Sequence, residues 1–287
     1  MSTSDTTVLL DQPARISSRL LRSELRLVFT RRRNLAILAV LACAPVLLGI
    51  AIKLGSRTGR GGGGGPAFIG QITQNGLFLA FTSLVVTLPL FLPLVVSVVS
   101  GEAVAGEAST GTLRSLLVVP VGRTRLLVVK FAGILAYAFA ATLVVGLSAI
   151  VVGFALFPTG PVTLLSGTVI PLGNALLRVA LVALYVAAML ATVAAIGLFV
   201  STLTEVPLAA MATTAIIVVT VEILDAVPQI ASIHPWLFTN WWLSFGDLLR
   251  DPVALDQMTR GLLVSIAYVA VFSALAWARF TTRDVTS

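Results

Sequence analysis

The sequence is divided into long apolar runs separated by short polar stretches. A helix needs roughly 20 mostly apolar residues to cross the hydrocarbon core of a bilayer. Six runs reach that length, at approximately 35–54, 77–100, 130–155, 178–201, 206–225 and 261–279. The pattern predicts an all-α membrane protein in which residues 1–34 precede a six-span transmembrane domain over residues 35–287.

Composition agrees with this prediction. Hydrophobic residues make up 57% of the 287 residues and charged residues only 11%, whereas soluble domains carry about 25% charged residues. The N-terminal segment is not expected to be a cleaved signal peptide. Its basic residues continue to Arg33, and the apolar run that follows is long enough to span.

Lys and Arg are unevenly distributed between the two sides of the membrane. Six spans place both termini on one side, together with loops 101–130 and 202–205. That side carries 13 Lys and Arg residues and the other side carries six. Because cytoplasmic loops are enriched in Lys and Arg, we expect a multi-pass protein of the cell membrane with both termini in the cytoplasm. Such flanks beside anionic lipid explain the net charge of +7 without a nucleic-acid partner.

Residues 101–130 carry too many charges to lie in hydrocarbon. Glu102–Ala108 can prolong the second span as a helix, and residues 109–111 break it. Thr112–Val119 can form a short helix that Pro120 ends. One face of this short helix is apolar and consists of Leu113, Leu116 and Leu117. That face either docks in a partner's groove or lies on the membrane surface.

The stretch AVAGEASTGTLRSLLVVPVGRTRLLVVK, residues 103–130, resembles the segment after the second span of ABC-2 type permeases, the membrane subunits of ATP-driven exporters. The match runs through Glu107, Gly111, Thr112, Leu113, Leu116, Leu117, Pro120, Val121, Arg123 and Lys130. The resemblance implies that this segment, including Arg114, is a coupling helix that docks on the ATPase. Two departures are Gly122, where serine is common, and Ala108-Ser109, where a second charge is common. The ending, with Phe280, Arg283 and Asp284, is also similar to the family's end, so the resemblance covers essentially the whole chain.

The segment before the first span has the pattern of an amphipathic helix. Its basic side comprises Arg15, Arg19, Arg22 and Arg26, opposite a largely apolar arc. It predicts an interfacial helix along the inner leaflet, and the resemblance implies the elbow helix of these permeases. Glu24 lies within the apolar arc. We expect it to meet a basic group of the ATPase or of the Arg31–Arg33 cluster, unless it snorkels or marks a local break.

The outer segment 226–260 is rich in aromatic residues, including Trp236, Phe238, Trp241, Trp242 and Phe245. It is either a short helix dipping into the outer interface or an ordinary aromatic belt. The resemblance implies an outer re-entrant segment between spans five and six. Nearby Glu222 either touches substrate or closes an outer gate, or it only contacts lipid headgroups.

Spans two and five carry hydroxyl groups among their apolar residues. Small hydroxylated residues permit close helix packing, but the resemblance implies that these two spans line a translocation pathway. The candidate pathway and outer-gate residues are therefore Thr87, Thr213, Thr220, Glu222, Trp241 and Trp242. Such a weakly polar wall suits an amphipathic or lipid-like compound or drug.

The chain lacks groups for chemistry of its own. It has no G-x-x-x-x-G-K-[ST] nucleotide loop, and GRGGGGGP at 59–66 is read as a flexible linker. One histidine, His234, and one cysteine, Cys43, cannot form a metal site or an internal disulfide. We expect Cys43 to be packed in the first span.

We therefore expect no enzyme, no bound cofactor and no metal, with ATP and Mg²⁺ held by a partner ATPase present in two copies. A second permease copy or a paralogue would complete the transporter. The alternatives are a membrane scaffold that anchors a cytoplasmic partner and a membrane-embedded lipid-modifying enzyme. The sequence decides neither the substrate nor the choice between homodimer and heterodimer.

Overall fold

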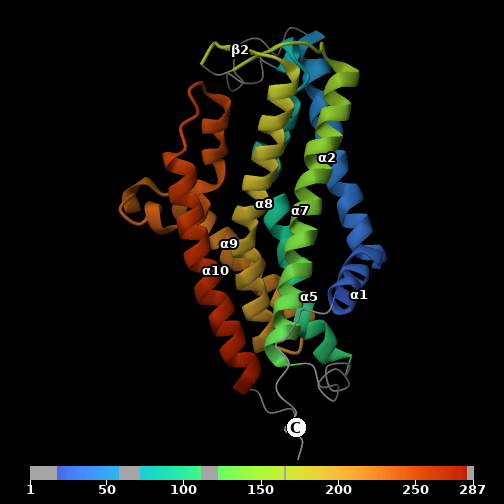
Figure 1. Ribbon diagram of the computed structural model, residues 1–287, viewed down its shortest axis with the longest axis vertical. Coiled ribbons are helices and arrows are strands. Elements are labelled where there is room, and N and C mark those ends of the chain that lie inside the picture. Colours follow the sequence, from blue (N-terminus) through green and yellow to red (C-terminus); the bar gives the residue numbers. More distant parts are fainter. Residues whose placement is uncertain (1–17, 58–71, 111–121, 165, 283–287) are drawn as a thin grey trace, which may run out of the picture.

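The structure is a computed structural model that describes residues 18–57, 72–110, 122–164 and 166–282. Long helices run side by side along the long axis of the molecule (Figure 1). The α-helices of the described residues are α1 (Ser18–Thr30), α2 (Arg32–Arg57), α4 (Phe78–Thr87), α5 (Phe91–Ser109), α7 (Arg123–Leu156), α8 (Leu172–Leu203), α9 (Pro207–Asp225) and α10 (Asp256–Thr282), of which α1 is short and oblique.

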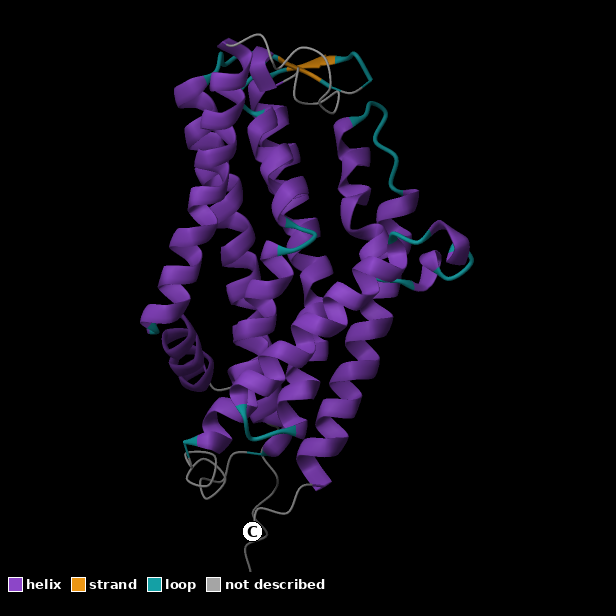
Figure 2. Ribbon diagram, turned by 180° about the vertical axis from the view of Figure 1, so that it is seen from behind, coloured by secondary structure: helices purple, strands orange, loops and turns teal. Residues whose placement is uncertain are grey.

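Two short irregular regions complete the fold. Strands β1 (Val162–Thr163) and β2 (Val169–Ile170) form an antiparallel hairpin between α7 and α8, at the upper end in the view of Figure 2. Between α9 and α10 lie the 3₁₀ helices η1 (Pro228–Ile230), η2 (His234–Trp236) and η3 (Thr239–Leu249).

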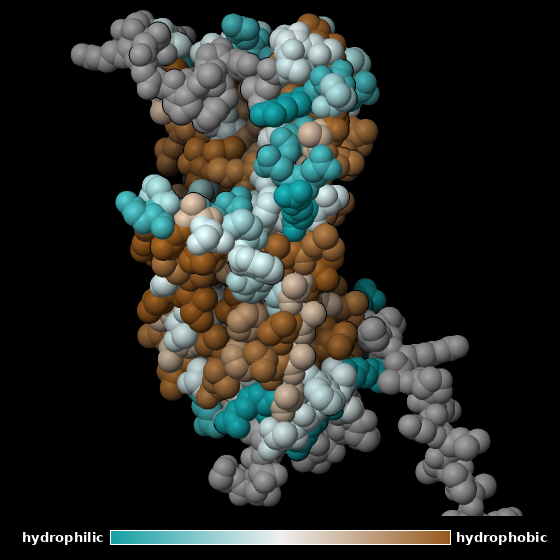
Figure 3. All heavy atoms as spheres, turned by 90° about the vertical axis from the view of Figure 1, so that its left-hand side faces the viewer, coloured by the Kyte–Doolittle hydropathy of each residue, from teal (hydrophilic) through white to brown (hydrophobic). Residues whose placement is uncertain are grey.

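Six helices within the described ranges are long and apolar enough to cross a membrane. They are α2, α5, α7, α8, α9 and α10. Apolar side chains form much of the outer surface between more polar ends (Figure 3). The prediction of a helical chain with six apolar spans is therefore confirmed, and the chain has the form of a multi-pass membrane protein.

The second predicted span differs from the structure, because it consists of two helices. Residues 88–90 separate α4 from α5, so the prediction of one helix over 77–100 is wrong. Pro89 and Pro93 are the physical reason. Each lacks a backbone N–H, and each ring crowds the carbonyl four residues earlier. The longer of the two helices, α5, starts at Phe91 and continues to Ser109.

The charged stretch 101–130 is also more helical than a loop. The expected extension over Glu102–Ala108 is confirmed as the end of α5. On the far side of residues 111–121, α7 begins at Arg123 and already includes Lys130. Among the described residues of this stretch, the charges therefore lie near the ends of helices rather than in a long loop.

The most buried of the six long helices is α8, which packs against α5, α7 and α10. In contrast, α2, α9 and α10 expose much of their apolar surface. Cys43 on α2 belongs to that exposed surface, so the expectation that it is packed is wrong. A helix that is apolar on all sides, as α2 is in its middle part, does not reveal from sequence which of its faces meets the core.

The chain between α9 and α10 does not form a simple loop. Residues 226–238, orange in Figure 1, project sideways about midway along the molecule, and η3 rises from there. Arg178 Nη1 of α8 donates to Leu248 O (2.6 Å) and Arg250 O (2.8 Å) at the end of η3. Tyr185 Oη donates to Trp241 O (2.8 Å). Helix α8 thus fixes η3 at both ends.

Candidate functional site

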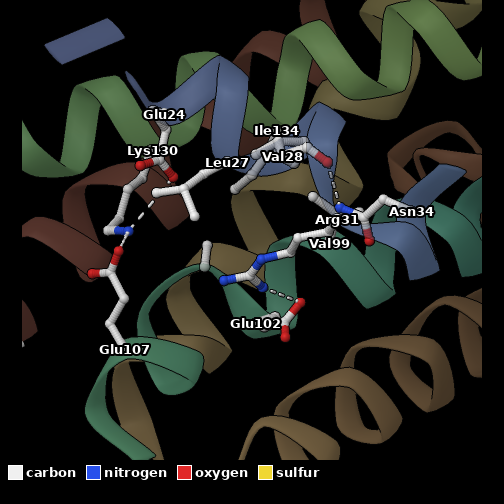
Figure 4. Close-up of a pocket in the computed structure, with 11 residues that line it drawn as sticks. Glu24, Leu27, Val28, Arg31, Asn34, Val99, Glu102, Glu107, Lys130 and Ile134 are labelled. Atoms are coloured by element: carbon white, nitrogen blue, oxygen red, sulfur yellow. Dashed lines mark hydrogen bonds and ion pairs between the residues drawn. The ribbon is translucent and has the colours of Figure 1, made fainter. Parts of the chain in front are cut away.

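Charged residues of α1, α5 and α7 lie close together (Figure 4), where α1 and α5 meet α7 in the lower part of Figure 1. Glu107 lies in the last turn of α5, and Lys130 lies two turns into α7. Lys130 Nζ is 2.5 Å from Glu107 Oε1. This ion pair joins the two helix ends between which residues 111–121 run. Outside the described residues lie the predicted docking positions Gly111, Thr112, Leu113, Arg114, Leu116, Leu117 and Pro120.

Lys130 is the centre of the cluster. Its side chain is 1% exposed, and Glu24 Oε1 of α1 lies 3.6 Å from Nζ. A buried ammonium is unfavourable unless opposite charges compensate for its lost hydration. Here two carboxylates from different helices supply that compensation. Lys130 therefore holds both α1 and the end of α5 against α7.

A second group of ion pairs fixes the turn between α1 and α2. Arg31 Nη1 lies 2.7 Å from Glu102 Oε2 of α5, and Arg33 Nη2 donates to the same oxygen. Asn34 Nδ2 donates to Val28 O across the turn (2.8 Å). These contacts set the angle between α1 and α2 and fasten their junction to α5.

The small cavity among these charged groups measures about 30 Å³. That is room for ordered water rather than for a substrate. The cluster is thus built to connect helices, and its chemistry is that of ion pairing.

Arg123 connects the beginning of α7 to the end of α10. Its Nη1 donates to Thr281 O (2.7 Å), and Trp277 Nε1 donates to Thr124 Oγ1 (2.8 Å). Two of the predicted docking residues, Glu107 and Arg123, thus lie at the two ends of residues 111–121. Each of them is bonded to a different neighbouring helix.

Within the segment predicted to be an interfacial helix, Ser18–Thr30 form the helix α1. Its exposed basic residues are Arg19, Arg22 and Arg26, and Arg15 lies outside the described residues. Glu24 differs from the expectation of a contact with Arg31–Arg33, because it faces α7 and pairs with Lys130. The reason is the course of α1 across α7: the Cγ atom of Glu24 lies 3.1 Å from the Cβ position at Gly133. A Cβ atom there would make a tight contact with Glu24, so Gly133 favours this close approach.

The predicted pathway hydroxyls lie in different environments. Thr87 belongs to α4, is 1% exposed, and donates to Ser83 O of its own helix (2.7 Å). Thr213 and Thr220 are exposed on α9. They lie two helical turns apart and share one face.

The outer-gate candidates surround the corner between α9 and η3. Glu222 is half-buried near the end of α9, and its Oε2 has no hydrogen-bond partner among the described residues. Trp242 is 1% exposed, whereas Trp241 is half-buried and its Nε1 donates to Pro235 O (3.0 Å). The aromatic segment is thus partly core and partly surface.

One important contact was missed from the sequence. Ser201 Oγ of α8 donates to Gly101 O (2.7 Å) and accepts the N–H groups of Val104 (3.0 Å) and Ala105 (2.9 Å). Through these three hydrogen bonds the Ser201 side chain joins α8 to the backbone of α5, in the same turns that carry Glu102. The only sequence signal was a serine at the end of an apolar run, which is too common to interpret.

The described residues contain no group of three or more His, Cys, Asp or Glu side chains arranged to hold a metal ion. The fold and the site therefore define a helical protein with six apolar, membrane-length helices and an ion-pair cluster at one end. Residues 66–286 match the family DUF2705, described as a protein of unknown function, and the chain belongs to that family. No curated protein matches the chain.

Proposed function

We propose that this chain is the permease subunit of an ABC-2 type exporter in the cell membrane, with both termini in the cytoplasm. It would form the translocation pathway and use ATP hydrolysis by a separate nucleotide-binding subunit. The observation that carries the proposal is the ion pair between Glu107 and Lys130. It closes the base of residues 111–121, the segment proposed as the coupling helix.

The cluster supports a mechanical role for that segment. A push on residues 111–121 would act on α5 and α7 together, since Glu107 and Lys130 join their ends. Glu24 and Arg123 extend these connections to α1 and α10. Four helices would thus respond to one docking event, as alternating access requires.

The corner between α9 and α10 supports the proposed exit. Residues 226–238, which include η1 and η2, project midway along the molecule rather than at its end (Figure 1). Backbone without regular α-helical bonding is tolerated at membrane depth where it is buried in protein, and η3, which is largely buried against α8 and α10, meets that condition. We interpret this corner as a re-entrant segment near the outer end of the pathway, with Glu222, Trp241 and Trp242 at the gate.

The wall of the pathway would come from α5 and α9 and would face a second permease copy or a paralogue. The exposed side of α9 combines Thr213 and Thr220 with large apolar residues such as Ile216. Such a surface favours an amphipathic or lipid-like compound as the exported molecule.

Co-purification tests the proposal. The full chain is isolated from its native membranes in mild detergent, and accompanying P-loop proteins are identified by mass spectrometry. We expect an ABC ATPase to co-purify with the wild type and to be lost in Leu116→Asp, which places a charge on the apolar docking face. Leu255→Asp is the matched control, because Leu255 is an exposed leucine of the opposite loop.

If no ATPase accompanies the wild type in several detergents, the exporter proposal is wrong. If Leu116→Asp retains the ATPase, the docking role of residues 111–121 is wrong, although the subunit assignment survives.

A further inference from the structure

An apolar furrow runs between α7 and α10 near their lower ends. It has a volume of about 300 Å³ and an almost entirely apolar lining. Its walls include Leu127, Val128, Phe131, Ala274 and Trp277, and its floor includes Leu198 of α8. Helices α7 and α10 both pack against α8 but make few contacts with each other, which leaves space between them.

The furrow opens outward toward the bilayer. Val128 is 46% exposed and Trp277 is 48% exposed, although both lie on helices of membrane-spanning length. An apolar space at this place does not attract water, because water needs polar partners. A hydrocarbon chain from the surrounding membrane meets the requirements of the lining.

The lower end of the furrow changes from apolar to polar within one helical turn. Trp277 Nε1 donates to Thr124 Oγ1 across the opening, and indole side chains favour the membrane interface. Arg123 and Arg125 flank Thr124 in the first turn of α7. The Nε atom of Arg125 is buried and has no hydrogen-bond partner within the described part of the chain.

Arg123 reaches across this end toward α10. It donates to Thr281 O, and a guanidinium has five N–H donors in a planar fork that matches phosphate geometry. Basic pockets between membrane helices recognise anionic lipid headgroups. The furrow thus combines a site for an acyl chain with cations at the depth where the headgroup of that chain would lie.

We propose that this furrow binds an anionic phospholipid, with one acyl chain between α7 and α10 and its phosphate at Arg123 and Arg125. This site is separate from the pathway surface of α9 and does not rest on the transport function. The bound lipid would connect the beginning of α7 to the C-terminal end of α10.

Fluorescence quenching tests the proposal in vesicles that contain the full chain. The probes are phosphatidylglycerol and phosphatidylcholine with brominated acyl chains, titrated separately. The signal of Trp277 is the difference between the wild type and Trp277→Phe, because the chain has three other tryptophans. We expect phosphatidylglycerol to quench at about fivefold lower mole fraction, as one cation near the surface contributes about 1 kcal/mol.

Two variants with matched controls separate the acyl-chain site from the headgroup site. Ala274→Phe fills the furrow and should abolish the saturable quenching, whereas Leu275→Phe, on the exposed side of α10, should retain it. Arg123→Gln should remove the preference for phosphatidylglycerol, and Arg279→Gln should keep it. Equal quenching by both lipids in the wild type, or unchanged quenching in Ala274→Phe, would overturn the proposal.

Discussion

At the scale of single residues, Lys130 has the most demanding position in the chain. Its ammonium group is nearly inaccessible and is compensated by Glu24 and Glu107. Each carboxylate is itself only 15% exposed. Removing the cation would leave two partly buried like charges facing each other, which makes this position unusually sensitive.

The Lys130→Met variant should therefore be destabilised by about 3 kcal/mol, because breaking a buried ion pair leaves uncompensated charge. Thermal unfolding in detergent measures this as a fall in Tm of several degrees. Adding Glu107→Gln should recover part of the loss. Lys53→Met is the control, because Lys53 lies near the C-terminal end of α2 and outside the ion-pair cluster. A Tm equal to that of the wild type in Lys130→Met would show that the ion pairs contribute nothing to stability.

Ser201 also joins two helices, through hydrogen bonds of an uncharged side chain. Ser201→Ala should lower the free energy of unfolding by about 1 to 3 kcal/mol, because two backbone N–H groups and one carbonyl lose a partner. Ser148→Ala is the matched control, since Ser148 Oγ donates only within its own helix. The same Tm for both variants would mean that the contact of α8 with α5 does not depend on this hydroxyl.

At the scale of elements, the lengths of the apolar runs were sufficient to locate the long helices but not their breaks. The run 77–100 looked continuous because its two prolines, Pro89 and Pro93, are apolar. Its division into α4 and α5 follows from backbone hydrogen bonding, which composition does not report. Residues Glu102–Ala108 continue α5 although they carry charge, because Glu102 and Glu107 form ion pairs with neighbouring helices.

The contact between α7 and the segment before α4 depends on two glycines. A Cβ atom at Gly153 would lie 2.1 Å from Gly76 O, whereas a Cβ atom at Gly146 meets nothing within 4 Å. Gly153→Ala should destabilise by about 2 kcal/mol through overpacking. Gly146→Ala should stabilise by about 0.5 kcal/mol, as alanine is favoured within helices. Chemical denaturation of the two variants compares these effects, and a stabilising Gly153→Ala would refute the close approach.

At the scale of the whole molecule, the six-span architecture was predictable and the arrangement of the helices was not. The positions of the charges along the chain indicated which end of the bundle they occupy. Which charges pair was not predictable: Glu24 was expected to meet a basic group of the ATPase or the Arg31–Arg33 cluster, or to snorkel, and it pairs with Lys130. Such pairings depend on crossing angles and on glycines such as Gly133, which one sequence does not specify.

The orientation in the membrane is a separate prediction at this scale. In a Cys43→Ala background, Ser166→Cys in the β hairpin should react with a membrane-impermeant maleimide in intact cells. Glu205→Cys, in the exposed turn between α8 and α9, should react only after permeabilisation. The reverse pattern would place the termini outside and would contradict the argument from Lys and Arg.

The central claim is that this chain governs ATP hydrolysis by its partner, and turnover of the reconstituted complex tests it most directly. The ATPase that co-purifies is assayed in proteoliposomes with the wild type, with Lys130→Met and without the chain. The account predicts that hydrolysis depends on the wild-type chain, and that Lys130→Met keeps the ATPase bound while losing this dependence. An ATPase rate that is the same with and without the chain would contradict the account and favour a membrane scaffold.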